Sequence, residues 1–310
     1  MPEASVYATT LADVGSADPS VFVVDAGLAS SMQTGLFHER FPSRYINLGI
    51  AEANAVGFAS GLARRGFKPI VHSFGNFLAR RAHDQVAISV ALPCLAITLV
   101  GGSCGVFDGR NGPSHLAGDD LATFTALPNF RVYEPADAVD LALALTEAVG
   151  SGGPSYLRLR RHGMPTAIGK RDNRGPVRLV CDGGSASRAT LVVIGNLLDE
   201  VMVTARILAD DGIGVDLYHV VRIKPLEIAP ILASARRSGR AIVIENHVPS
   251  GGGAQAVVAA LAPAGLPITT LTLPDAFLPA GDPRWLAAQA GLDATTLTAR
   301  ISAELARGVS

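Results

Sequence analysis

One glutamate in an apolar stretch is the first residue whose type and position could support chemistry. Glu52 is the only charged residue between Arg44 and Arg64. From about residue 50 to Gly66, alanines recur at every fourth position, which predicts a helix that is apolar on nearly all sides and therefore buried. A carboxyl group is costly to bury unless it is paired or protonated. Glu52 could therefore act as an acid, or it could simply stabilise the positive end of the helix dipole.

A glycine-rich loop contains the second candidate, His115. The loop reads Val-Gly-Gly-Ser-Cys-Gly-Val-Phe-Asp-Gly-Arg-Asn-Gly-Pro-Ser-His over residues 100–115 and follows a strand expected at residues 95–100. Ligands of open α/β sheets bind beyond the carboxyl ends of strands, so His115 could transfer protons there. A flexible surface loop with a solvated histidine is the alternative explanation of the same residues.

Aromatic and cationic side chains lie near these two segments. Phe74 and Phe77 could line an apolar ligand site, or they could form ordinary core packing. Arg158, Arg160 and Arg161 come at the end of an expected strand. Guanidinium groups suit phosphate by their bidentate geometry, but the same arginines could form a solvated cationic strand end.

The elements that must position these residues alternate between strands and helices. In residues 1–165 apolar runs predict strands at residues 21–24, 69–72, 95–100, 131–133 and 156–159. The stretches between them predict helices at residues 50–66, 77–90, 119–126 and 136–149. This alternation indicates a parallel sheet with helices on both faces.

A second α/β unit follows a turn-rich segment. Gly, Pro, Asp and Asn cluster there, so we expect a linker at 166–186 between domains 1–165 and 187–310. Strands are then predicted at residues 190–194, 215–218, 241–245 and 268–273, with helices at residues 198–210, 226–237 and 253–262. The predicted fold class is two α/β domains with mainly parallel sheets.

Composition argues against several classes of function. Hydrophobic residues make up 48% of the 310 residues and charged residues 17%, which favours large buried interfaces. The net charge of −1 provides no electrostatic footprint for nucleic acid or an anionic membrane. The sequence shows no apolar run of transmembrane length and no signal-peptide pattern at residues 1–5, so a cytoplasmic protein is expected. Cys94, Cys104 and Cys181 lack metal-ligand spacing, and the apolar run around Cys94 predicts that it is buried.

Taken together, these motifs resemble the transketolase family. Residues 47–54 are similar to the segment that carries the catalytic glutamate of its pyrimidine-binding domain, and residues 100–115 run in register with a family loop that ends Gly-(Pro/Ala)-Thr-His. Residues 72–85 resemble the family pattern Ser/Thr-Phe-x-x-Phe…Arg-Ala-(aromatic)-Asp-Gln, with His83 in place of the aromatic residue. The resemblance continues into the C-terminal half, at residues 223–225, 245–247 and 251–252.

The resemblance implies a cofactor and a role for most of the candidates. Glu52, kept protonated by an apolar pocket, would hydrogen-bond the aminopyrimidine ring of thiamine diphosphate, and Phe74 and Phe77 would stack on that ring. His115 would donate or accept a proton at the substrate, in an enzyme that transfers a two-carbon ketol unit from a ketose phosphate. Ser31 and Arg161 would contact the sugar phosphate. The other implied cofactor- and substrate-binding positions are His83, Ser103 and Asn111.

The other catalytic half of such enzymes has no counterpart in this sequence. The family binds Mg²⁺ and the cofactor diphosphate through a Gly-Asp-Gly segment, which the 310 residues lack. A full-length transketolase is also about twice this length. The resemblance therefore implies the C-terminal subunit of a split transketolase. A partner N-terminal subunit would hold Mg²⁺, and we expect an α2β2 assembly that acts on small-molecule sugars.

Several departures from the family pattern concern the substrate and the cofactor. Ser103 stands where a histidine usually contacts the substrate, and Asn111 where an aspartate recognises a hydroxyl of the sugar donor. Gly27 replaces an aspartate at the cofactor site, and the family's arginine near the domain start has no clear counterpart at residues 4–10. Because Glu52 is retained, we expect intact cofactor activation and a non-standard substrate.

Other functions share many of these features. The β subunit of a 2-oxo acid dehydrogenase, or a relative of deoxyxylulose-phosphate synthase, would have the same fold and glutamate but would use a pyruvate-like donor with release of CO₂. The loop ending at His115 favours a transketolase. A non-catalytic scaffold or regulatory subunit is the alternative from another class, and the retention of Glu52 argues against it.

Overall fold

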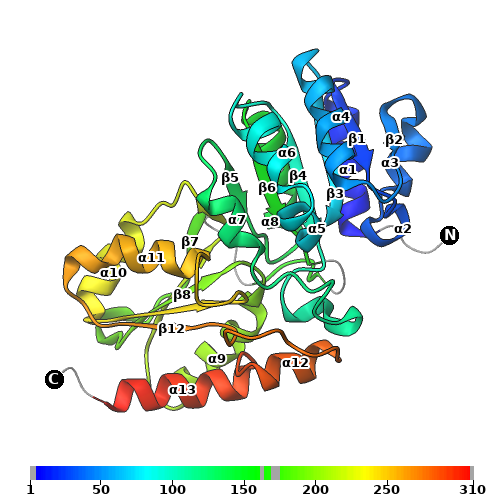
Figure 1. Cartoon of the computed structure of the whole chain (residues 1–310). Coiled ribbons are helices and arrows are strands. Elements are labelled where there is room, and N and C mark those ends of the chain that lie inside the picture. Colours follow the sequence, from blue (N-terminus) through cyan, green and yellow to red (C-terminus); the bar gives the residue numbers. More distant parts are fainter. Residues whose placement is uncertain (1–4, 161–163, 169–174, 308–310) are drawn as a thin grey trace.

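The computed structural model describes residues 5–160, 164–168 and 175–307, which form two α/β units side by side (Figure 1). The first unit is built on a seven-stranded sheet in the order β10-β5-β6-β4-β3-β1-β2. Its strands are β1 (Val21–Asp25), β2 (Tyr45–Asn47), β3 (Lys68–Phe74), β4 (Thr98–Gly102), β5 (Arg131–Tyr133), β6 (Ser155–Arg158) and β10 (Arg222–Lys224). Every neighbouring pair is parallel except β10 and β5, and β10 comes from the second half of the chain.

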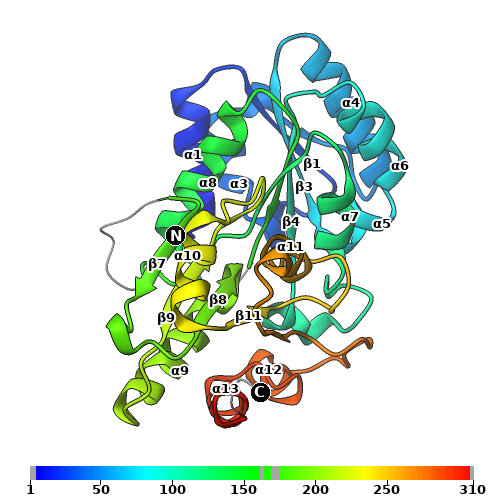
Figure 2. The same cartoon turned by 90° about the vertical axis from the view of Figure 1, so that its left-hand side faces the viewer.

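Helices cover both faces of this sheet, as Figure 2 shows. One face carries α1 (Val6–Ala17), α3 (Gly35–Arg40) and α8 (Ala138–Gly150), and the other carries α4 (Glu52–Arg64), α5 (Gly75–Arg80), α6 (His83–Gln85) and α7 (Asp120–Ala126). Val23 and Ile70 belong to the apolar cluster on the first face, whereas their chain neighbours Val24 and Val71 belong to the cluster on the second. Successive strand residues point to opposite faces, so these strands are apolar throughout.

The second unit is built on a five-stranded sheet in the order β12-β11-β8-β9-β7. Its strands are β7 (Val177–Cys181), β8 (Thr190–Ile194), β9 (Asp216–Val220), β11 (Ala241–Glu245) and β12 (Ile268–Leu271). Only the edge strand β7 is antiparallel to its neighbour within this described sheet. The helices of the unit are α9 (Leu198–Asp210), α10 (Ala229–Ser238), α11 (Gly253–Leu261), α12 (Pro283–Gln289) and α13 (Ala294–Ala306).

The predicted fold class is confirmed, because both units are α/β with mostly parallel sheets. The limits of the two domains, 1–165 and 187–310, stay a prediction. Strand β7 lies inside the segment 166–186 that was expected to be a linker, and it pairs with β9. The turn residues around this short strand conceal it in the sequence. The two units also share an interior, since one apolar cluster contains Val71 of β3 together with Ile194 and Ile223 from the second half.

Three local predictions are wrong. The helix expected at residues 77–90 is divided into α5, α6 and a π-helical segment, Val86–Ala91, because the amide groups of Arg81 and Ala82 both donate to the carbonyl of Phe77. Helix α4 is buried on one face only, and Phe58 on its other face is 42% exposed. Cys94 is exposed, in a turn after that π-helical segment. No helix within the described ranges combines the length and apolarity that crossing a membrane requires.

Candidate active site

Glu52 lies in the first turn of α4, at the carboxyl edge of the first sheet. Its side chain is only 3% exposed. The N-cap residue Ala51 makes no side-chain capping bond, and the Glu52 carboxylate instead faces the end of β3 and the break after α5. There it accepts a hydrogen bond from the Ser73 hydroxyl at 3.3 Å. Besides any favourable interaction with the helix dipole, Glu52 therefore presents a carboxylate to the edge of the sheet where ligands of such folds bind.

Arg81 is the partner of Glu52 that sequence reasoning missed. One guanidinium nitrogen lies 3.2 Å from each carboxylate oxygen of Glu52. The same guanidinium lies over the ring of Phe77, 3.9 Å from its centroid. The carboxyl group that the sequence shows without a nearby charge is therefore paired with Arg81 in the fold. The motif Arg-Ala-x-Asp-Gln made this arginine visible in the sequence, but only the fold shows what it contacts.

Three aromatic rings form a cluster beside this ion pair. Phe74 ends β3, Phe77 lies in α5, and His115 ends the glycine-rich loop. The ring centroids lie 5.7 Å apart for Phe74 and Phe77, 5.8 Å for Phe74 and His115, and 5.3 Å for Phe77 and His115. The His115 Nδ1 lies 2.9 Å from the Ser114 hydroxyl. The structure thus brings an apolar ring surface, an imidazole and a carboxylate to one edge of the sheet.

Residues 103–118, which we call the substrate loop, carry three of the predicted positions. Ser103 is buried with a φ of 59°, and its hydroxyl has no hydrogen-bond partner in the part of the chain that is described. Asn111 is exposed at the end of a 3₁₀ helix, Val106–Asn111. The Asn76 amide of α5 donates to the carbonyl of Leu116 at 2.8 Å, so α5 holds the backbone directly after His115.

The other predicted positions are less directly connected to this cluster. Ser31 is half-buried in the short helix α2 (Ala29–Met32), which follows β1 at the same sheet edge. His83 is exposed at the start of α6, and Arg161 lies outside the described residues. Gly27 has a φ of +80°, and a Cβ there would lie 3.1 Å from the Ile50 backbone nitrogen. The aspartate that the resemblance leads one to expect at this position would therefore be crowded by the segment leading into α4.

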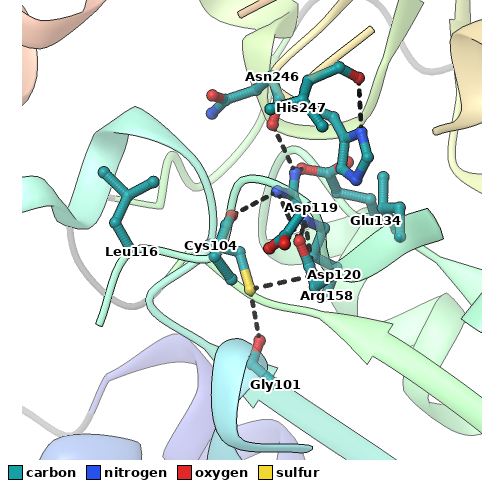
Figure 3. A network of polar contacts seen from close by, with 12 residues as sticks. Gly101, Cys104, Leu116, Asp119, Asp120, Glu134, Arg158, Asn246 and His247 are labelled. Carbon is teal, nitrogen blue, oxygen red and sulfur yellow. Dashed lines mark hydrogen bonds and ion pairs between the residues drawn. The ribbon is translucent and has the colours of Figure 1, made fainter. Parts of the chain in front are cut away.

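A buried polar network lies behind the substrate loop (Figure 3). Arg158 is fully buried at the end of β6, so the interpretation of this residue as a solvated cation is wrong. It donates to Asp120, to Glu134 at 2.8 Å, and to the backbone carbonyls of Ala117 and Asn246 at 2.9 and 3.0 Å. Burial raises the pKa of Glu134 to about 7 in spite of the nearby Arg158 charge. The network joins the first unit to the residues that follow β11 of the second.

Two further features of this region are its lack of a metal-ligand cluster and the contacts of Arg160, which follows Arg158 by two residues. No group of three or more His, Cys, Asp or Glu side chains that could hold a metal ion occurs among the residues the structure describes. Arg160 lies over the Phe107 ring at 3.9 Å and pairs with Asp199 of α9 at 3.0 Å. It too connects the substrate loop with the second unit.

Comparison with known proteins accounts for this arrangement. The family model of the transketolase pyrimidine-binding domain matches residues 3–166, and that of the transketolase C-terminal domain matches residues 180–297. A 6-deoxy-6-sulfo-D-fructose transketolase subunit from Clostridium sp. (strain MSTE9) is 33% identical over 248 residues, which cover 79% of this chain and 76% of the relative. A 1-deoxy-D-xylulose-5-phosphate synthase from Leptothrix cholodnii is 33% identical over 96% of this chain, which spans 47% of that longer relative.

A solved structure shows the same likeness in three dimensions. It is a split gene transketolase in an inactive β4 tetramer, which superposes with a TM-score of 0.87 at 30% identity and covers 97% of both chains. Sequence and fold agree over both α/β units. The chain therefore belongs to the transketolase family.

Proposed function

We propose that this chain is the C-terminal subunit of a two-component, thiamine-diphosphate-dependent transketolase. It would transfer a two-carbon ketol unit from a ketose or ketose phosphate donor. The observation that carries the proposal is the buried Glu52 carboxylate at the sheet edge, next to the ring cluster of Phe74, Phe77 and His115. Membership of the transketolase family supports the same conclusion.

The residues present fit the aminopyrimidine end of the cofactor. Glu52 would hold a proton at a ring nitrogen, and Phe77 with Phe74 would provide the apolar surface against which the ring stacks. When bound, thiamine diphosphate supplies a nucleophilic carbon that accepts the ketol unit. His115 would donate or accept a proton at the substrate oxygen, and Ser31, Ser103, Asn111 and Arg161 are proposed to contact the substrate. Arg81 would leave Glu52 when the ring binds, since both use the same carboxylate.

The diphosphate end of the cofactor must be held elsewhere. The sequence has no Gly-Asp-Gly segment, and the described residues contain no metal-binding cluster. We propose that an N-terminal partner subunit holds Mg²⁺ and the diphosphate in an α2β2 assembly. Exposed apolar side chains on or next to α4 and the π-helical segment that contacts it support a subunit interface, because large exposed apolar patches mark interaction sites. These are Ile50, Phe58, Ile88 and Leu92, exposed by 76%, 42%, 58% and 73%.

We also propose that the donor is not a standard pentose phosphate. Ser103 and Asn111 replace the side chains that transketolases commonly direct at the sugar, and an aspartate in place of Gly27 would be crowded and strained. One relative is named for a sulfonated ketose, which supports a donor whose terminal anion or hydroxyl pattern is unusual. A screen of ketoses, ketose phosphates and sulfonated ketoses tests this. Efficient turnover of xylulose 5-phosphate with ribose 5-phosphate would contradict it.

A deoxyxylulose-phosphate-synthase-like activity is the second candidate, because relatives with that name match almost the whole chain. Such an enzyme releases CO₂ from a pyruvate-like donor, whereas a transketolase releases a shortened aldose. Measuring CO₂ release with pyruvate therefore separates the two functions. Release of CO₂ at rates comparable with ketol transfer would replace the transketolase proposal.

Calorimetric titration of thiamine diphosphate with Mg²⁺ is the decisive experiment for the proposed assembly. It should show tight binding to the chain co-purified with its N-terminal subunit and none to the chain alone. The Glu52→Gln variant of the two-subunit enzyme should transfer the ketol unit about 100-fold or more slowly than wild type. This is the range expected for loss of a positioned acid–base group. Glu39→Gln, at an exposed carboxylate, is the matched control. Full activity of Glu52→Gln would instead indicate a scaffold.

A further inference from the structure

We propose that Asn246 of the second unit is a positioning residue for the substrate loop. This rests on the proposed function, because the loop carries Ser103, Asn111 and His115. The consequence is that the second α/β unit, which contributes none of the proposed substrate contacts, takes part in substrate recognition. The argument follows from the contacts that Asn246 makes and from those of the loop around it.

Asn246 comes directly after β11 and is fully buried (Figure 3). Its Oδ1 accepts a hydrogen bond from the N–H of Val106 at 3.0 Å. Val106 is the first residue of the 3₁₀ helix in the substrate loop. Its Nδ2 donates to the Asn196 Oδ1 at 3.0 Å, and its backbone carbonyl accepts from Arg158 at 3.0 Å. One asparagine thus joins the loop, the second sheet and the buried arginine.

The loop approaches Asn246 so closely that the preceding residue must be glycine. Gly105 has a φ of +67°, and a Cβ at this position would lie 2.1 Å from the Asn246 Nδ2. Ser103, two residues earlier, is also in the left-handed region, with a φ of 59°. A non-glycine residue in that conformation is held there by its surroundings. The hydrogen bond from Val106 therefore holds a stretch of the loop in which two residues, Ser103 and Gly105, have positive φ.

Other parts of the loop also contact the second unit. Gly281 donates its N–H to the Gly109 carbonyl at 3.2 Å, and Val248 donates to the Gly118 carbonyl at 2.8 Å. A Cβ on Gly109 would lie 1.9 Å from a methyl group of Leu286 in α12, so the two segments are in direct contact. Three apolar loop side chains, those of Val106, Phe107 and Leu116, belong to the apolar cluster of the second unit. Asn246 provides the buried polar contact among these mostly apolar and backbone ones.

The partner Asn196 makes a conservative rescue feasible. The Asn196 Nδ2 has no hydrogen-bond partner among the residues described, while its Oδ1 accepts from Asn246. Aspartate at position 246 keeps an oxygen for Val106. Its second oxygen can accept a hydrogen bond from Asn196 once that amide rotates by half a turn. Alanine at position 246 offers neither oxygen.

Steady-state kinetics of the assembled two-subunit enzyme test the proposal. Asn246→Ala should raise KM for the ketose donor by about tenfold, as expected for a buried N–H left without its acceptor. Asn246→Asp should stay within about threefold of wild type, and adding Asn196→Asp should abolish that rescue because two carboxylates would then face each other. A readout that needs no thiamine diphosphate is hydrogen exchange at residues 106–116 of the chain alone. It should be faster in Asn246→Ala and in the double variant Asn246→Asp with Asn196→Asp, but not in Asn246→Asp.

Thr204→Val is the matched control. It removes a hydrogen bond of similar length that the buried Thr204 hydroxyl donates to the Ala294 carbonyl at 3.2 Å, inside the same unit and not involving the loop. Equal effects of Thr204→Val and Asn246→Ala on KM or on loop exchange would overturn the proposal, as would unchanged loop exchange in Asn246→Ala. Failure of the proposed function would look different, since wild type itself would then transfer no ketol unit while the exchange pattern could still follow Asn246.

Discussion

Glu134 should make the stability of this chain depend on pH. The carboxyl group is fully buried between the two units, and Arg158 donates to its Oε1 at 2.8 Å. Its Oε2 has no hydrogen-bond partner within the described structure. Burial raises the pKa from 4.5 to about 7, which outweighs the lowering effect of Arg158, and the negative charges of Glu245 and Asp120 add to the rise.

The sign of the effect follows from proton binding. Between pH 4.5 and about 7 the folded chain keeps a proton that the unfolded chain has released, so stability falls as the pH rises. The contribution is fully present below pH 4.5 and lost above about pH 7. At about 1.4 kcal/mol for each pH unit between the two pKa values, the total loss is about 3 kcal/mol.

Glu134→Gln removes this titration while keeping an amide oxygen for Arg158. Urea unfolding of the chain should show similar stabilities for wild type and variant at pH 4.5, and an advantage for the variant that grows to about 3 kcal/mol at pH 8. Glu39→Gln, at an exposed carboxylate, should show a small difference that does not vary in this way. A pH-independent difference between wild type and Glu134→Gln would refute the reasoning.

The remaining predictions concern the cofactor site and two glycines. Arg81→Ala should tighten thiamine diphosphate binding to the two-subunit enzyme about fivefold. The reason is that its half-exposed ion pair with Glu52, worth about 1 kcal/mol, no longer competes with the cofactor for the carboxylate. Weaker binding in calorimetry would contradict this. Gly75→Ala should destabilise the chain by about 1–3 kcal/mol in thermal unfolding, because the new Cβ would lie 2.7 Å from the Cys104 Sγ. Gly57→Ala should stabilise it by up to about 1 kcal/mol, because the added methyl group meets no atom within 4 Å and helix propensity rises; a loss of stability would show otherwise.

Much of the framework could be predicted because it depends on local patterns. The central strands are buried on both faces, so continuous apolar runs such as that of β8 mark them in the sequence. Helix α4 begins within two residues of its expected start, since the four-residue alanine spacing is a strong helical signal. Glu52 was conspicuous because it is the only charged residue between Arg44 and Arg64. The position of the glycine-rich loop at the carboxyl edge of the sheet could be predicted from the order of strands and helices alone.

The parts that could not be predicted depend on residues far apart in the chain. Arg158 looks like a solvated cation because its buried partners Glu134 and Asn246 are 24 and 88 residues away. Arg81 also has a distant partner, because Glu52 is 29 residues away in helix α4. Strand β10 has only three residues, and its partner β5 lies in the other half of the chain. Local periodicity carries no information about such pairings.

Strand β10 also has a consequence for how such chains can be divided or recombined. It completes the edge of the first sheet, and its last residue, Lys224, donates to the carbonyls of Thr125 and Leu127 at the end of α7. A fragment cut anywhere between residues 166 and 186 would lose this strand and leave the backbone groups of β5 open to pairing with other molecules. The two halves are therefore not interchangeable modules. A chimera between relatives should inherit β5 and β10 from the same parent, although they lie about ninety residues apart.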